Sequence, residues 1–256
     1  MQLSCRTADH AVDARRISRC SPRCARGRII AASAVALLPQ WTCNADAQVS
    51  GSIAVTNDYR LRGRTLSDSR GAVIATAAYD DRSGAYGEAA VIGSTGHGGG
   101  PRLLGAVGNV GYAMRLANGI TVDAGASRAE FSVVPGSRRR GYTELYFGAN
   151  HRDLSASVRY SPDYFRPGNA TIYLEANAAL RPMAGWRLLG HVGSLFYLNR
   201  AFASAHVQHD WRLGLARRVG TLDAQVAVSG GGPGADFYNG GGHSRTALTV
   251  VLSRPF

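Results

Sequence analysis

Apolar and polar residues alternate along most of the chain after residue 47, and this period of two is that of a β-strand. The clearest case is 171–181, where Ile172 and Leu174 share one face while Tyr173 and Glu175 share the other. Helical periodicity is almost absent, and no window has about 18 uninterrupted apolar residues, which argues against a membrane-spanning helix. The pattern therefore predicts an all-β chain whose strands each have one apolar face.

Twelve segments carry this pattern, and each is close to the roughly 9–11 residues that cross a bilayer at a tilt. They are 48–60, 71–80, 85–95, 103–116, 119–130, 141–151, 153–162, 170–181, 185–199, 204–218, 220–230 and 244–256. The links between them alternate, with short turns such as 117–118 and longer loops such as 61–70 and 231–243. An even strand number with short turns at one end is typical of bacterial membrane barrels. We predict one antiparallel transmembrane β-barrel of about twelve strands, with both termini periplasmic.

The last strand ends flush with the end of the sequence, on Phe256. Leu248, Val250 and Leu252 lie on its more apolar face, and Arg254 interrupts that face. A strand that ends in an aromatic residue resembles the closing strand of bacterial outer-membrane barrels. The resemblance implies that Phe256 belongs to the signal read by the barrel-assembly machinery.

The first 47 residues have the features of a secretory leader. Arg23, Arg26 and Arg28 precede an apolar run at 29–38, and an Ala-Asp-Ala site ends at Ala47. We predict Sec-type export and cleavage near Ala47, which divides the chain into a leader at 1–47 and a barrel at 48–256. All four cysteines precede this site, so the predicted mature chain contains no disulfide.

All 29 basic residues of the chain are arginine, and after residue 47 there are 22 of them against 14 acidic residues, a net charge of +8. A basic excess is common in nucleic-acid-binding proteins, but no basic helix or basic-aromatic motif accompanies it here. We therefore expect no nucleic acid partner. In an outer-membrane barrel, arginines would instead face lipopolysaccharide phosphates or anionic solutes.

Charged residues on the polar faces of the strands are predicted to point into the barrel, because an arginine on the lipid face costs about 2–4 kcal/mol at the midplane. The candidate pore-lining residues are Asp58, Arg60, Glu88, Arg115, Asp123, Glu144, Arg159, Glu175, Arg187, Asp210, Arg212 and Asp223. Two interpretations remain open. The charges line a water-filled pore and set its charge preference, or they pair across the lumen and plug it.

Aromatic residues near the strand ends are predicted to form girdles at the two membrane interfaces. They are Tyr59, Tyr79, Tyr112, Tyr160, Trp186, Phe196 and Phe256.

Enzymatic chemistry has little support in the sequence. A lipid hydrolase in a barrel wall needs a Ser–His pair on the lipid face. His243 and Ser244 are adjacent, so a strand would point them to opposite faces. His191, His206 and His209 have no evident serine and carboxylate partners. We predict a protein that is not an enzyme, without a metal site or cofactor, and a lipid hydrolase is the least favoured interpretation.

Several short motifs resemble those of the TorF family, whose members are named as porins. The run Asp-Tyr-Arg-Leu-Arg-Gly at 58–63 is similar to the family's opening motif, although Leu61 replaces the usual aromatic residue. The runs at 84–87, 142–148 and 160–164 resemble later motifs. Within these runs, the matching family positions, to which no chemistry is assigned, are Asp58, Tyr59, Arg62, Gly63, Glu144 and Tyr146. The resemblance implies a barrel more firmly than it implies a solute.

Together these patterns predict a porin in the cell outer membrane for passive diffusion of small hydrophilic solutes. Outer-membrane lipids, lipopolysaccharide and the assembly machinery are its expected partners. Arg138, Arg139 and Arg140 form a basic patch on a predicted outer loop, and with Arg62, Arg64 and Arg70 they favour a weak anion preference. The alternative is a barrel that conducts nothing and only supports its surface loops.

Overall fold

The computed structural model describes residues 47–95, 100–132, 140–199, 205–233 and 246–256. Within these residues the chain forms strands and turns, and no helix that could cross a membrane occurs there. The strands of the barrel are β1 (Ala47–Thr56), β4 (Ala72–Asp81), β5 (Ala85–Thr95), β6 (Pro101–Arg115), β7 (Thr121–Phe131), β8 (Arg140–His151), β9 (Leu154–Ser161), β10 (Thr171–Met183), β11 (Trp186–Tyr197), β12 (Val207–Val219), β13 (Leu222–Gly232) and β14 (Ala247–Pro255).

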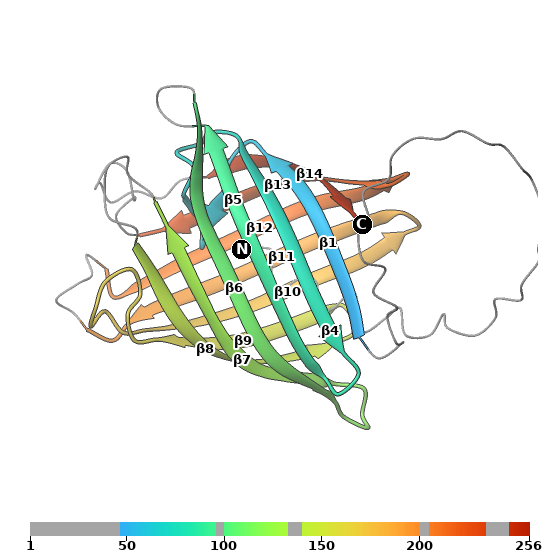
Figure 1. Cartoon of the computed structure of the whole chain (residues 1–256), viewed down its shortest axis with the longest axis horizontal. Coiled ribbons are helices and arrows are strands. Elements are labelled where there is room, and N and C mark those ends of the chain that lie inside the picture. The colour runs from blue at the N-terminus through green and yellow to red at the C-terminus, as the bar shows by residue number, and fades with distance from the viewer. Residues whose placement is uncertain (1–46, 96–99, 133–139, 200–204, 234–245) are drawn as a thin grey trace, which may run out of the picture.

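These twelve strands form one closed antiparallel barrel in which neighbours in sequence are neighbours in the sheet. Figure 1 shows β1, β4, β5 and β6 on the near wall, with β10 to β13 crossing behind them. The barrel closes where β1 pairs with β14, and Thr56 lies opposite Val251 there. Gly51 and Phe256 exchange two main-chain hydrogen bonds, of 3.0 and 2.9 Å, at the other end of this seam. The predicted twelve-stranded antiparallel barrel is confirmed.

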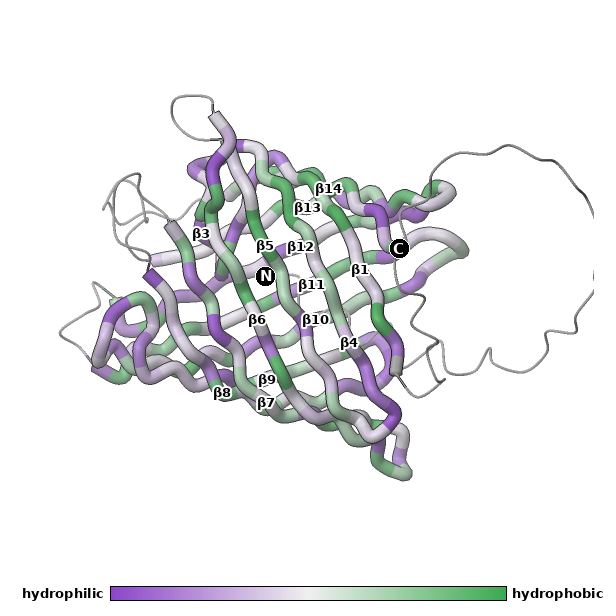
Figure 2. Tube along the Cα trace, viewed as in Figure 1, coloured by the Kyte–Doolittle hydropathy of each residue, from purple (hydrophilic) through white to green (hydrophobic). Residues whose placement is uncertain are grey.

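The alternation of the sequence maps onto the two faces of the wall, as Figure 2 illustrates by the alternating hydropathy along the strands. Outward-facing side chains are apolar and exposed, for example Val110 at 63%, Leu145 at 59% and Leu213 at 58%. Inward-facing residues on the same strands are largely polar. An exposed apolar band of this extent has no favourable environment in water, whereas it matches the hydrocarbon core of a bilayer.

The first predicted strand is too long, and this changes the interior of the barrel. It ends at Thr56 rather than at residue 60, and 57–71 turns inward before β4 begins. Within this stretch, β2 (Arg60–Leu61) and β3 (Arg64–Thr65) form a small hairpin. We call residues 57–71 the plug segment. Leu66, fully buried, belongs to the core cluster together with Phe131 of β7.

The two ends of the barrel differ in the length of their links. The turns at 82–84, 152–153 and 220–221 join strands at the end where β1 begins and β14 finishes. The plug segment and the 162–170 link lie at the opposite end. This arrangement follows the alternation read from the sequence. Which end faces the periplasm remains a prediction.

Candidate functional site

The barrel encloses a cavity of about 190 Å³. Every barrel strand contributes to its wall, and the plug segment contributes at one end. Many of the lining side chains are neutral and polar, as period-two strands with a polar inward face require: Asn109, Ser127, Asn150, Ser155, Ser157, Asn177, Gln225, Ser229 and Thr249. Such a wall suits water and hydrophilic solutes.

The plug segment reaches into the lumen through a tight turn at Arg62 and Gly63. Both residues have positive φ, at 48° and 74°, as a two-residue hairpin turn of this kind requires. A Cβ at Gly63 would lie 2.7 Å from the Cα of Gly231 on β13. The tip of the plug segment therefore packs directly on the main chain of the wall, where only glycine fits.

A buried carboxylate organises the interior of the plug segment. Asp58 accepts hydrogen bonds from Arg60 at 2.9 Å, from Thr65 at 2.6 Å and from Ser67 at 3.1 Å. The Ser67 hydroxyl also accepts a hydrogen bond from the main-chain N–H of Tyr59 at 2.8 Å. Because the carboxylate is buried and its hydrogen-bonding capacity is used locally, these bonds hold the segment in one shape.

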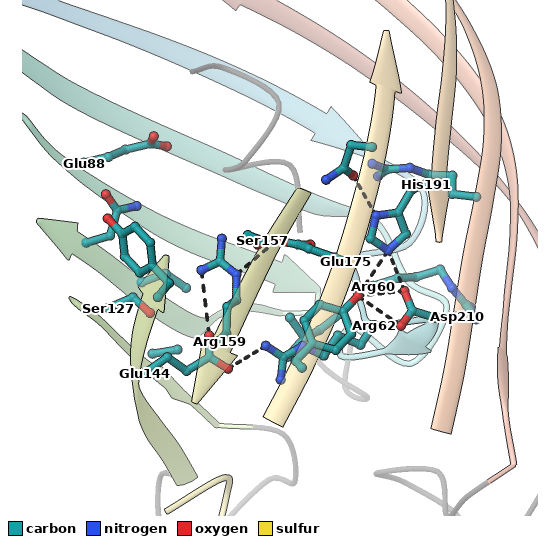
Figure 3. A pocket seen from close by; sticks show the side chains of 18 of the residues that line it. Arg60, Arg62, Glu88, Ser127, Glu144, Ser157, Arg159, Glu175, His191 and Asp210 are labelled. Atoms are coloured by element: carbon teal, nitrogen blue, oxygen red, sulfur yellow. Dashed lines mark hydrogen bonds and ion pairs between the residues drawn. The ribbon is translucent and has the colours of Figure 1, made fainter. Parts of the chain in front are cut away.

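Arg62 joins the plug segment to the far wall. Its guanidinium donates to Glu144 of β8 at 2.5 Å, and both side chains are less than 10% exposed. The same guanidinium lies 3.9 Å from the centre of the Tyr173 ring and 5.0 Å from that of Tyr164. Burial raises the pKa of Tyr164 to about 12, so this ring stays neutral and presents a π face to the cation. We call the Arg62–Glu144 contact the latch pair (Figure 3).

The latch pair continues into a second ion pair along the wall. Arg159 of β9 donates to Glu175 of β10 at 3.0 Å and lies 3.9 Å from Glu144. Ser157 donates to the same Glu175 carboxylate at 2.7 Å. Figure 3 shows Arg159 between Glu144 and Glu175. The result is a row of alternating charges that starts on the plug segment and ends on β10.

A histidine network occupies the neighbouring wall. His191 of β11 contacts Asp210 of β12 through Nε2 at 2.7 Å and Asn177 of β10 through Nδ1 at 2.7 Å. The hydroxyl of Tyr173 donates to the same Asp210 carboxylate at 3.1 Å. Since the ring of Tyr173 also lies under the Arg62 guanidinium, Tyr173 connects this network to the latch pair.

A third group lies on the wall formed by β5, β7 and β8. The hydroxyl of Tyr86 donates to Asp123 at 3.0 Å and is 2.7 Å from the hydroxyl of Tyr146. Asn150 also donates to Asp123, at 3.4 Å. This carboxylate is held by neutral groups rather than by an arginine.

Counted over the described lining residues, carboxylates outnumber guanidiniums. The seven acidic residues are Asp58, Asp80, Glu88, Asp123, Glu144, Glu175 and Asp210. The four arginines are Arg60, Arg62, Arg159 and Arg212. The wall therefore carries a formal charge of −3 with His191 neutral, although the predicted mature chain is basic.

Most of the predicted pore-lining residues lie on this wall. Those that do are Asp58, Arg60, Glu88, Asp123, Glu144, Arg159, Glu175, Asp210 and Arg212. Arg115 is exposed at the end of β6, and Arg187 instead pairs with Asp223 at 3.1 Å. Asp58 and Arg60 lie on the plug segment rather than on the first strand. Whether these residues line a conducting path stays a prediction.

Two other expectations change. Tyr59, predicted at a membrane interface, is 5% exposed and packs inside the barrel with its ring 6.3 Å from that of Phe131. Arg62, predicted on an outer loop, is buried in the latch pair. Arg138 and Arg139 lie outside the described residues, and Arg140 is exposed at the start of β8. In the sequence, Leu61 and Leu66 are apolar residues within a predicted outer loop. They were the signal that this loop folds into the barrel instead of lying exposed.

A Ser–His pair that the sequence did not reveal lies on the outer face. Ser194 of β11 and His209 of β12 are opposite each other, with Oγ and Nδ1 2.9 Å apart. Among the described residues, His209 has no hydrogen bond to a carboxylate or amide that would orient it. The main chain around Ser194 is hydrogen-bonded to the strands on both sides, β10 and β12. No main-chain N–H group is therefore left there to stabilise an oxyanion. The geometry is that of a polar cross-strand pair.

The described part of the chain contains no group of three or more His, Cys, Asp or Glu side chains placed to hold a metal ion. The site is a polar lumen in which most of the charged side chains described above are paired. Its chemistry is that of solvation and ion pairing.

A family model described as "Bacterial protein of unknown function (Gcw_chp)" matches residues 41–233. No curated protein matches the chain. Among solved structures, the chain is similar to the NanC porin in a rhombohedral crystal form, with a TM-score of 0.55 and 11% identity, over 79% of this chain and 98% of that one.

Two further structures are similar to a lesser degree. The KdgM porin in complex with disordered oligogalacturonate has a TM-score of 0.48 and 11% identity, over 82% of this chain and 99% of that one. The outer membrane channel DcaP of Acinetobacter baumannii has a TM-score of 0.40 and 11% identity, over 86% and 99%. At this level of identity, the likeness to the NanC porin establishes a common barrel fold.

Proposed function

The chain belongs to the Gcw_chp family of bacterial proteins of unknown function, and we propose that it is an outer-membrane channel of porin type. In this proposal small hydrophilic solutes cross the barrel by passive diffusion. The observation that carries the proposal is a polar cavity inside a closed barrel with an apolar outer surface. The resemblance of the sequence motifs to the TorF porins agrees with it.

The location of the protein follows from the same two surfaces. An outward apolar band needs lipid, and a closed barrel satisfies its main-chain hydrogen bonds there. We propose the outer membrane, reached by Sec-type export and cleavage near Ala47, with Phe256 read by the assembly machinery. Lipopolysaccharide and other outer-membrane lipids would then contact the exposed apolar side chains.

The plug segment would set the permeability of such a channel. It occupies one end of the lumen and is held by the latch pair and by the Asp58 hydrogen bonds. A barrel of about twelve strands lies between small barrels filled by side chains and large open ones. We therefore propose a narrow channel rather than an open pore.

We base the proposed charge preference of the channel on the charged residues that line the cavity rather than on the net charge of the whole chain. The sequence favours weak anion preference, from arginines expected on outer loops. One of these, Arg62, is instead paired inside, and the lining carries three more carboxylates than guanidiniums. Carboxylates along a narrow path raise the local concentration of cations. We propose weak cation preference for freely diffusing ions.

Liposome swelling tests the proposal of passive diffusion. Purified protein is folded into liposomes, which are diluted into isotonic solutions of uncharged sugars of increasing size. We expect swelling that is fast for the smallest sugars and falls steeply with size, because the plug segment narrows the lumen. Swelling no faster than in protein-free liposomes at every sugar size would contradict the proposal.

The charge preference needs a separate measurement, the reversal potential across a planar bilayer in a potassium chloride gradient. We expect the sign that indicates cation preference, and a smaller value in 1 M salt because screening shortens the reach of the lining charges to about 3 Å. The opposite sign would favour the prediction made from the outer arginines.

A barrel that conducts nothing is the second candidate, and the buried plug segment is the observation that favours it. Its network of short hydrogen bonds and a buried ion pair is also what a permanent structural core requires. In that case the protein would support its surface loops, and neither swelling nor channel current would appear even when the plug segment is released.

A further inference from the structure

Four polar side chains form a row across the inner wall. Register pairs place Asn177 of β10 beside His191 of β11, His191 beside Arg212 of β12, and Arg212 beside Ser229 of β13. All four residues line the cavity. The row therefore crosses four neighbouring strands and faces the lumen.

The two halves of the row differ in their hydrogen bonding. Asn177 and His191 are bonded to each other, and His191 also contacts Asp210. Arg212 has no hydrogen bond or ion pair to any described residue, and its buried Nε has no partner. The buried hydroxyl of Ser229, next to it, also lacks one. The other three arginines of the lining, Arg60, Arg62 and Arg159, each donate to a carboxylate.

Unpartnered donors of this kind indicate a ligand. A buried polar group without a hydrogen bond is costly, and an arginine presents several N–H groups in a planar fork that fits a carboxylate. Ser229 adds a hydroxyl donor beside that fork. We propose that Arg212 and Ser229 bind the carboxylate of a small hydroxylated solute inside the lumen. The proposal rests on the proposed channel function and names a solute class for it.

The surrounding charge restricts this class to solutes with a single carboxylate. The lining as a whole carries seven carboxylates against four guanidiniums, so a second negative group on the solute would face net repulsion. Neutral polar side chains such as those of Gln225 and Asn177 also line the cavity and suit hydroxyl groups. A sugar acid with one carboxylate combines both features.

Calorimetric titration of the detergent-folded full chain tests the site without requiring conduction. D-gluconate serves as the probe, sorbitol as its uncharged counterpart and D-glucarate as its dicarboxylate counterpart. We expect saturable binding of gluconate, at least tenfold weaker binding of glucarate and no measurable binding of sorbitol. Equal binding of gluconate and sorbitol would overturn the proposal, and so would glucarate binding more tightly than gluconate.

Variants locate the binding. Arg212→Gln should weaken gluconate binding by about 10- to 100-fold, the range expected for hydrogen bonds to a charged group, and Ser229→Ala by about 2- to 10-fold. Arg212→Lys keeps the positive charge but loses the planar fork of N–H groups. Its affinity for gluconate should therefore lie between those of the wild type and Arg212→Gln. Arg217→Gln is the matched control, because Arg217 lies on the same strand but packs over Trp186 on the outer face.

Heat-modifiable gel mobility verifies that each variant is folded before titration. Unchanged gluconate binding in folded Arg212→Gln would overturn the assignment, and an equal loss in Arg217→Gln would show a nonspecific effect of net charge. Swelling and current measurements on the same samples separate the two proposals. Binding without any solute flux would contradict the channel and retain the site, whereas flux without gluconate binding would contradict the site alone.

Discussion

Replacing Arg62 by Ala should release the plug segment from the wall. The substitution removes the 2.5 Å contact with Glu144 and the guanidinium that lies 3.9 Å from the centre of the Tyr173 ring. It leaves the Asp58 hydrogen bonds intact, since these form within the plug segment itself. We therefore expect the segment to keep its local shape and to lose its attachment to β8 and β10.

The size of the effect follows from burial. Removing one partner of a buried ion pair typically costs about 3–5 kcal/mol, because the other charge is left without compensation. Arg159, 3.9 Å from Glu144, offsets part of this cost, and the lost cation–π contact adds about 1–2 kcal/mol. A net loss of about 3 kcal/mol would shift the ratio of attached to released plug by roughly 100-fold.

Single-channel recording in planar bilayers measures this shift. We expect Arg62→Ala to open more often to a conductance several times larger than that of the wild type. Glu144→Gln should have a similar effect, and the double variant less than the sum of the two, because it leaves no buried charge unpaired. Arg128→Ala is the matched control, since Arg128 pairs with Glu130 and Asp163 on the outer face. Conductance in folded Arg62→Ala equal to that of the wild type would show that the latch pair does not hold the plug segment in place.

Three further substitutions test the barrel seam, the lipid-facing surface and the tip of the plug segment. Asn57→Ala removes a side-chain amide that bonds twice to the main chain of β14, at 3.1 and 2.8 Å, where β1 leaves the wall. The barrel should then lose about 1 kcal/mol of folding stability. In heat-modifiable gel mobility, the band of the folded protein should disappear at a lower temperature. Leu145→Arg, on the outer face, should destabilise the barrel in lipid by about 2–4 kcal/mol in urea titrations. Gly63→Ala should displace the plug tip from Gly231 and raise conductance, whereas Gly119→Ala, also at positive φ but with open space around it, should not.

The wall of the barrel could be predicted from the sequence because contact with lipid imposes a simple rule on its strands. Each strand must turn one face to hydrocarbon, so a period of two identifies both the strand and the direction of its side chains. Leu174 faces outward and Glu175 inward, as the alternation predicts. The even number of strands follows from antiparallel closure, and the alternation of short and long links reflects the difference between the two ends of such a barrel.

The interior was less predictable because its contacts join distant parts of the chain. Arg62 and Glu144 are 82 residues apart, and no periodicity relates them. The plug segment also contains the polar and glycine residues of an ordinary outer loop. Its distinguishing signal is the set of apolar residues Tyr59, Leu61 and Leu66, which an exposed loop would not require. The lack of a partner for Arg212 depends on the placement of every surrounding side chain.

Whether the protein is a channel narrowed by its plug segment is tested by comparing the wild type with a variant in which 58–70 is replaced by a short Gly-Ser linker. Both are folded, checked by heat-modifiable mobility and recorded in planar bilayers under the same salt. We expect small discrete conductance steps for the wild type and steps several times larger for the variant, because the same barrel then lacks its plug segment. The absence of steps in both proteins would contradict a channel, and equal steps would contradict a lumen narrowed by this segment.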